Sequence, residues 1–274
     1  MRHLQTGQFH GQTNQTVQLD GLTLTDTEYT QPKVDWHYHE NAYFTFILQG
    51  KVIEGNKKEV YSCQAGSLLF HNWQEPHYNI KPEGFTRGFH LELHPDWFHQ
   101  QDFDLRNLTG SINIANPEPK FLLYKIFRET KLNDSTTNLS VQSILLQLLN
   151  KMLYEEKSKL YNKPVWVKEI KELLHEKFTE KISLTELSVE LGIHPVHLSR
   201  DFPRYFNCTL GEYIRKLKVE KALSLLAQTQ KSLSDITFEC GFSDQSHFIR
   251  CFRAVNAISP LQHRRIIFKQ NLEC

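Results

Sequence analysis

Three histidines in the first third of the chain have side chains and a spacing suited to binding a ligand. His37 and His39 lie two residues apart in an alternating segment, 34–39, so a strand would place both imidazoles on one face. His77 follows in a later segment. Neutral imidazole both donates and accepts hydrogen bonds, and it also binds Zn²⁺, Ni²⁺, Cu²⁺ and iron. The three residues therefore indicate either a polar pocket for an organic effector or a divalent metal site.

A second group of residues near the C-terminus could read DNA. Arginine can bind guanine through two hydrogen bonds, and glutamine can bind adenine in the same way. Such side chains lie on the polar faces of two predicted helices. The predicted contacts are His194, Val196, His197, Ser199, Arg200 and Arg204 in the first helix, and Ser243, Gln245, Ser246, His247, Ile249, Arg250 and Arg253 in the second.

The charge distribution favours a local site for a polyanion. The 274-residue chain has a net charge of only +1, but residues 200–269 hold 12 Lys/Arg against 6 Asp/Glu. A solvated helix face would also explain a mild basic excess, so the choice between a polyanion site and a solvated face depends on the sequence motifs.

The sequence predicts no membrane association. No apolar run approaches the ~20 residues of a membrane-spanning helix, and the N-terminus lacks a secretory apolar region. Five scattered cysteines are typical of reduced thiols, so we expect a cytoplasmic protein without membrane association.

The helices that carry the predicted DNA contacts belong to an internal repeat. Residues 183–187 match 232–236 at an offset of 49, and Gly192 matches Gly241 at the same offset. Beyond one inserted residue, Arg200 matches Arg250 at an offset of 50. Each copy has a serine N-cap, a short helix, a glycine turn and a second helix. This order predicts two helix-turn-helix units.

A long helix is predicted to connect the two units. Thr209 and Glu212 have the spacing of a capping box and open a helix over 210–228. At 1.5 Å per residue it would span roughly 27 Å. That length would hold the two units near the ~34 Å spacing of successive major grooves.

The last hundred residues resemble the DNA-binding domain of the AraC/XylS family of bacterial regulators. The resemblance is carried by 236–252, with Gly241-Phe242, Phe248 and Arg250-Cys251-Phe252, and by 258–264, with Ser259-Pro260 and a final Arg. It implies binding to double-stranded DNA, and contact with RNA polymerase if the protein is an activator. The family usually has glycine where this chain has Ala257, which predicts a strained turn there.

The segment 34–93 has the pattern of a strand-rich domain. It contains short β-branched and aromatic runs and a hairpin signal at Gly55-Asn56. Residues 36–39, with Ala65-Gly66 and His77, resemble the two motifs of a cupin β-barrel. In metal-binding cupins a Glu follows the second His by four residues, whereas Tyr43 stands there in this chain. Glu40 or Glu92 could replace that ligand. Apolar walls are expected from Phe44, Phe46, Leu69 and Trp73.

Between the domains, the sequence predicts helices with one apolar face. Residues 120–132 have a helical pattern, and a longer helix follows them. The apolar face of that longer helix needs a partner surface, which is either the seam of a homodimer or the protein's own barrel or 120–132 segment. The residues of that face are Val141, Ile144, Leu145, Leu148, Leu149, Met152 and Leu153.

These features together predict an α+β multidomain protein. We expect a cupin-like effector-sensing β-barrel in 1–116, a helical linker or dimerisation region in 117–163, and a double helix-turn-helix domain in 164–274. The predicted function is a sequence-specific transcription factor, not an enzyme, controlled by a small-molecule effector. The alternatives are a metal-dependent cupin dioxygenase or isomerase fused to a DNA-binding tail, and a constitutive regulator with an empty barrel.

Overall fold

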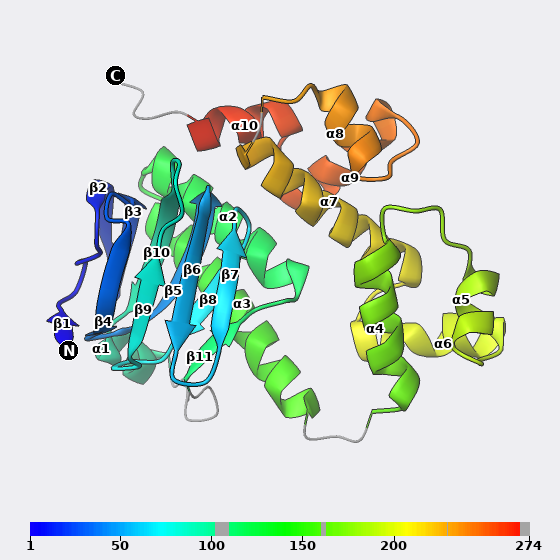
Figure 1. Ribbon diagram of the computed structural model, residues 1–274, viewed down its shortest axis with the longest axis horizontal. Coiled ribbons are helices and arrows are strands. Elements are labelled where there is room, and N and C mark those ends of the chain that lie inside the picture. The colour runs from blue at the N-terminus through cyan, green and yellow to red at the C-terminus, as the bar shows by residue number, and fades with distance from the viewer. Residues whose placement is uncertain (102–109, 160–162, 229, 269–274) are drawn as a thin grey trace. The chain divides into compact units, whose positions relative to one another are not determined.

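The computed structural model describes residues 1–101, 110–159, 163–228 and 230–268 (Figure 1). The chain folds into two compact units. The first comprises residues 1–156 with the segment from Arg264 onward, and the second comprises residues 157–263. Among the described helices, none combines the length and the apolar character needed to cross a membrane.

The first unit contains two facing β-sheets, which confirms the predicted strand-rich fold; the strands do not appear as one continuous barrel in the described part of the chain. The first sheet has the order β1-β4-β9-β6-β7, and the second has the order β11-β8-β5-β10-β3-β2. The strands are β1 Arg2–Leu4, β2 Gln12–Leu19, β3 Leu22–Glu28, β4 Lys33–His39, β5 Ala42–Gln49, β6 Lys51–Asn56, β7 Val60–Gln64, β8 Leu68–His71, β9 His77–Ile80, β10 Arg87–Leu93 and β11 Ser111–Asn113.

The predicted hairpin is present, but its turn lies later than expected. β6 pairs with β7 in antiparallel register, with Gly55 opposite Val60. The Asn56 side-chain oxygen accepts hydrogen bonds from the backbone N–H groups of Lys58 and Glu59, which closes the turn there. Gly55 is a strand residue instead. Its missing side chain makes room for the Tyr78 ring, which a Cβ would meet at 2.3 Å.

Helices cover the second sheet of the first unit. They are α1 Pro95–Gln100, α2 Pro117–Leu132 and α3 Thr137–Lys159. Pro117 at the first helical position and the Asn116 cap start α2. Tyr124 and Phe127 of α2 pack against Phe46 and Phe89 of the sheet, with ring centroids 4.5 and 5.2 Å apart.

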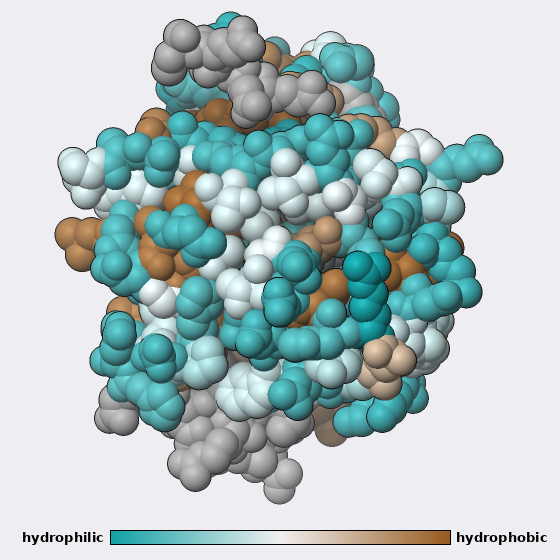
Figure 2. Space-filling view, turned by 90° about the vertical axis from the view of Figure 1, so that its left-hand side faces the viewer, coloured by the Kyte–Doolittle hydropathy of each residue, from teal (hydrophilic) through white to brown (hydrophobic). Residues whose placement is uncertain are grey.

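Most of the apolar face of α3 is an internal packing surface, which favours the predicted alternative of packing within the protein over an exposed dimer seam. Ile144 and Leu153 are half-buried. The other five residues of that face are at most 4% exposed within this single chain: Val141, Leu145, Leu148, Leu149 and Met152. Residues 117–156 thus pack as part of the first unit and do not form a separate linker. On the face of the molecule drawn in Figure 2, apolar atoms lie in small separate spots on a mostly hydrophilic surface.

All regular secondary-structure elements described in the second unit are helices. These are α4 Val165–Lys177, α5 Leu184–Glu190, α6 Pro195–Phe206, α7 Leu210–Gln228, α8 Leu233–Glu239, α9 Gln245–Asn256 and α10 Pro260–Phe268, the last of which continues past His263. The predicted bounds of α7 are confirmed. Both Thr209–Glu212 capping hydrogen bonds are present.

Candidate nucleic-acid interface and intersheet pocket

The first helix-turn-helix consists of α5 and α6. Ser183 and Glu186 form the predicted capping box at the start of α5. Gly192 has a φ of +64°, which glycine adopts without strain, and reverses the chain before α6. His194 caps α6, accepting a hydrogen bond from the Val196 N–H, with Pro195 at the first helical position. The inward residues Leu198 and Phe202 are fully buried, so the opposite face of α6 points outward.

The second helix-turn-helix consists of α8 and α9 and repeats this arrangement. Ser232 caps α8, and Gly241 turns the chain with a φ of +76°. Only glycine fits at Gly241, because a Cβ there would lie 2.0 Å from the Thr179 carbonyl oxygen. The cap of α9 is Asp244, one residue after the predicted Ser243. Ala257 ends α9 with a φ of +62°, which confirms the predicted left-handed turn.

The predicted contact residues lie on the outward faces of α6 and α9. Of the thirteen, only His247 and Ile249 are half-buried, and the rest are exposed. Phe248 and Phe252 form the inward face of α9 and are fully buried. The two second helices therefore present polar side chains to solvent at matched positions, as recognition helices require.

The matched arginines of the two units differ in their surroundings. The Arg200 guanidinium donates to both carboxylate oxygens of the neighbouring Asp201, at 3.0 and 3.3 Å, and also lies 3.0 Å from His197 Nδ1. The position that matches Asp201 in the second unit is Cys251. Among the described residues, Arg250 has no ion pair or hydrogen-bond partner for its side chain. Arg250 is therefore the arginine that is free to bind a new acceptor.

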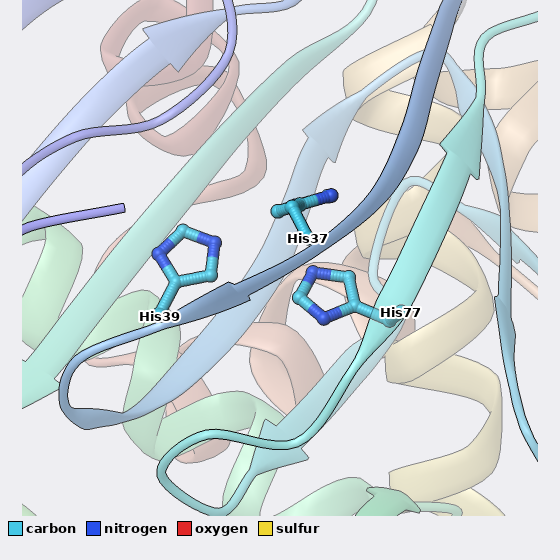
Figure 3. Close-up of side chains that lie close together, drawn as sticks. All are labelled: His37, His39 and His77. Carbon is cyan, nitrogen blue, oxygen red and sulfur yellow. The ribbon is translucent and has the colours of Figure 1, made fainter. Parts of the chain in front are cut away.

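The three-histidine cluster, His37, His39 and His77, lies between the two sheets of the first unit (Figure 3). His37 and His39 extend from the same side of β4, and His77 of β9 is the strand partner of His37. One ring nitrogen from each histidine lies within 4.8 Å of the others, and all three side chains are buried. The sequence prediction that these residues meet is confirmed by the geometry.

Backbone carbonyls orient two of these imidazoles. His37 Nδ1 lies 2.9 Å from the Asp35 carbonyl oxygen, and His77 Nδ1 lies 3.1 Å from that of Glu75. A carbonyl can only accept, so each Nδ1 carries the proton and each Nε2 keeps its lone pair. His39 Nδ1 is buried without a hydrogen-bond partner. Outer hydrogen bonds of this kind are typical of histidines that bind metal ions.

Burial keeps the cluster uncharged. Burial lowers the pKa of His37 to about 4 and that of His77 to about 3. It lowers the pKa of His39 well below its usual value, and the neighbouring histidines add to this shift. At neutral pH the pocket therefore presents neutral nitrogen acceptors.

Sequence reasoning missed four other polar residues of this region. His71 and His90 interrupt apolar strand runs, a signal that could have identified them. Tyr29 and His90 line the pocket and lie 3.2 Å apart, Oη to Nε2. Glu54 also lines it, with Oε1 3.1 Å from His71 Nε2. Burial raises the pKa of Glu54 to about 8, so this carboxyl is neutral near pH 7.

Other predicted pocket residues point elsewhere. The carboxylates of Glu40 and Glu92 accept hydrogen bonds from Thr6 and Gly7 in the N-terminal loop and do not line the pocket. Phe44 and Phe46 lie on the opposite face of β5 from Tyr43, because strand residues alternate. The rings that line the pocket instead belong to Phe9, Tyr29 and Tyr43.

The second unit matches a known domain family. Residues 187–266 match the model of a helix-turn-helix domain. The HTH-type transcriptional regulator YbfI of Bacillus subtilis is 26% identical over 227 residues, which cover 77% of this chain and 80% of that protein. The regulator GbdR of Pseudomonas aeruginosa is 33% identical over 99 residues, 36% of this chain and 27% of that protein. The chain thus spans only about a quarter of the length of some relatives.

A solved structure provides a further likeness. It is a transcriptional regulator of Chromobacterium violaceum, described as having an AraC-type DNA-binding domain, with 27% identity and a TM-score of 0.36. The match covers 39% of this chain and 95% of that one. The domain match, the repeat and the two capped helix pairs agree on one assignment. Residues 187–266 of this chain form a helix-turn-helix domain with two units, in a chain that is similar to bacterial HTH-type transcriptional regulators.

Proposed function

We propose that this protein is a sequence-specific, double-stranded-DNA-binding transcription regulator of the cytoplasm. The observation that carries the proposal is the pair of outward helix faces on α6 and α9. Each has a buried aromatic on the inside and arginine, histidine and serine on the outside. Helices of this kind enter the major groove and read base edges through their exposed side chains.

In this proposal the two units contribute unequally to base reading. Arg250 can bind a guanine edge without first breaking an ion pair. Arg200 must leave, or share, the carboxylate of Asp201. Because exposed ion pairs of this kind are screened by solvent and contribute little, the difference is modest. Exposed serines near the helix starts, such as Ser243, could donate to phosphates and fix the register.

Selection from random DNA duplexes tests the proposed two-site reading. We expect the full chain to enrich two short conserved blocks whose centres lie about 10–11 base pairs apart, one turn of the duplex. We expect this spacing because α7, a helix of 19 residues, connects the two helix-turn-helix units and fixes the separation of their recognition helices. Enrichment of a single block would contradict the use of both units, and no enrichment would contradict specific DNA binding.

The intersheet pocket is proposed to bind the effector that controls DNA binding. It lies in the first unit and is lined by polar side chains from both sheets. If the effector is a metal ion of the kind found in cupins, His37, His39 and His77 would hold it, and the ion would supply a positive charge in a buried site. The named relatives are regulators, which supports a regulator without enzymatic activity.

Two further partners are proposed, RNA polymerase if the protein is an activator, and a second copy of the chain. Activation would require a surface for RNA polymerase. A homodimer would need a surface other than the apolar face of α3, because that face is buried within the chain. Size-exclusion chromatography with light scattering, with and without DNA, would determine the number of chains in the complex.

A further inference from the structure

Tyr43 lines the pocket and stands at the sequence position where metal-binding cupins have a glutamate ligand. It is 2% exposed, and its ring packs on His39 with centroids 4.4 Å apart. Its hydroxyl lies 3.0 Å from His77 Nε2. Because His77 Nδ1 donates to a backbone carbonyl, Nε2 accepts, and the Tyr43 hydroxyl must be the donor. The Tyr43 hydroxyl therefore already donates its proton to the nitrogen that would bind an ion.

A metal ion bound to both atoms would replace that proton between the Tyr43 oxygen and His77 Nε2. In a tetrahedral site with bonds of about 2.0–2.1 Å, neighbouring ligand atoms lie about 3.3 Å apart. The Tyr43 oxygen and His77 nitrogen, 3.0 Å apart, are already close to that spacing. The three ring nitrogens, within 4.8 Å of one another, need to approach by about 1.5 Å at most to share an ion with it.

The size of the pocket favours an ion over an organic molecule. The cavity volume is about 30 Å³. A single water needs about 10–15 Å³ on this measure, so the cavity has room for about two waters. Drug-sized ligands occupy pockets of about 300–1,000 Å³. In the described conformation, an ion with one water fits, and a larger effector would require the sheets or the N-terminal loop to move.

The donor atoms also indicate the class of ion. Three neutral imidazoles suit Zn²⁺, Cu²⁺, Ni²⁺ or iron and do not suit Ca²⁺ or Mg²⁺, which prefer oxygen ligands. An anionic oxygen among the ligands would partly neutralise the buried charge, as the missing cupin glutamate would. We propose that Tyr43 is the fourth ligand of a divalent transition-metal ion held by His37, His39 and His77. As its oxygen binds the ion, the phenolic proton passes to solvent. This proposal deepens the proposed effector pocket and does not depend on DNA binding.

Copper titration of the full chain tests this proposal. After chelator treatment and dialysis, the protein is titrated with Cu²⁺ and observed by visible absorption. We expect one equivalent to bind and a phenolate-to-copper charge-transfer band to appear. Tyr43→Phe should lose that band and weaken Cu²⁺ binding by about 10-fold or more. His37→Ala should weaken binding by at least about 100-fold.

Tyr61 provides the matched control. It is a half-buried tyrosine of β7 in the same unit, its hydroxyl donates to the Ser111 carbonyl oxygen, and it does not line the pocket. Tyr61→Phe should keep both the band and the affinity of the wild type. Far-UV circular dichroism would show that each variant is folded. The proposal is overturned if wild-type protein binds no equivalent of Cu²⁺, or if Tyr43→Phe and Tyr61→Phe give the same spectrum and affinity. Loss of DNA binding alone would leave these results unchanged and would contradict only the proposed regulator function.

Discussion

Acidification of the metal-free protein is expected to destabilise the first unit steeply below pH 6.5. Five buried histidines of this unit have pKa values held below their usual value by burial: His37, His39, His71, His77 and His90. Between about pH 4 and 6.5 they are protonated in the unfolded chain and neutral in the folded one. The unfolded state then binds more protons, so the free energy of unfolding falls as the pH falls.

Two buried carboxyls act in the opposite direction. Burial raises the pKa of Glu54 to about 8 and that of Glu92 to about 7. Between pH 4.5 and 7 these groups are protonated in the folded state and ionised in the unfolded state. The histidines outnumber the carboxyls, so unfolding between pH 4.5 and 6.5 takes up a net number of protons. The free energy of unfolding therefore falls as the pH falls through this range, with a stability maximum near neutral pH.

Urea unfolding at pH 5.5, 6.5 and 7.5 would measure this effect. Hydrogen exchange read by mass spectrometry would assign the loss to the strands of the first unit and not to α7. His90→Gln, which removes one of the five titrating groups, should reduce the pH slope by about one proton, or ~1.4 kcal/mol per pH unit. An unfolding midpoint that is the same at pH 5.5 and 7.5 would show that these histidines are not buried in solution.

Replacing Leu148 by Glu is expected to unfold the first unit. Leu148 is 0% exposed on the inner face of α3. Burying a carboxylate in this apolar packing surface is a change of the kind that costs more than about 4 kcal/mol. Leu139→Glu on the same helix is the matched control, because Leu139 is 76% exposed. It should change the free energy of unfolding by less than about 0.5 kcal/mol. Thermal unfolding of both variants would decide, and a folded, monomeric Leu148→Glu protein would instead support a seam between two chains.

The two helix-turn-helix units and the helix between them could be predicted from sequence because their signals are local, whereas α4 was not predicted. Caps, turn glycines and the apolar spacing of each helix all lie within a few residues of the bonds that they form. The capping box at Ser183, the αL turn at Ala257 and the bounds of α7 were therefore predictable. The cap of α9 shifted by one residue because Asp244 and Ser243 are both good N-cap residues.

The first unit was less predictable, because its contacts join distant parts of the chain. The strands at 12–19 and 22–28 were missed, since the polar edge strand β2 lacks a strong apolar pattern. The apolar face of α3 predicted the need for a partner but not its identity, and here the partner lies in the same unit. The positions of His71 and Glu54 depend on how the two sheets face each other, which sequence spacing does not encode.

Titration of Arg250→Ala and Arg200→Ala on a selected duplex is the most direct test of the central claim. If the exposed faces of α9 and α6 read bases, Arg250→Ala should lose about 1–3 kcal/mol of binding on that duplex and clearly less on a scrambled one. Arg200→Ala should lose less than Arg250→Ala, because Asp201 already pairs with Arg200. Gel-shift titration at one fixed salt concentration would measure the affinities of the wild type and both variants for both duplexes, since phosphate contacts depend strongly on salt. An equal loss on both duplexes would mean that Arg250 contacts phosphate only. Unchanged affinity of both variants on both duplexes would contradict the assignment of α6 and α9 as the DNA-reading helices.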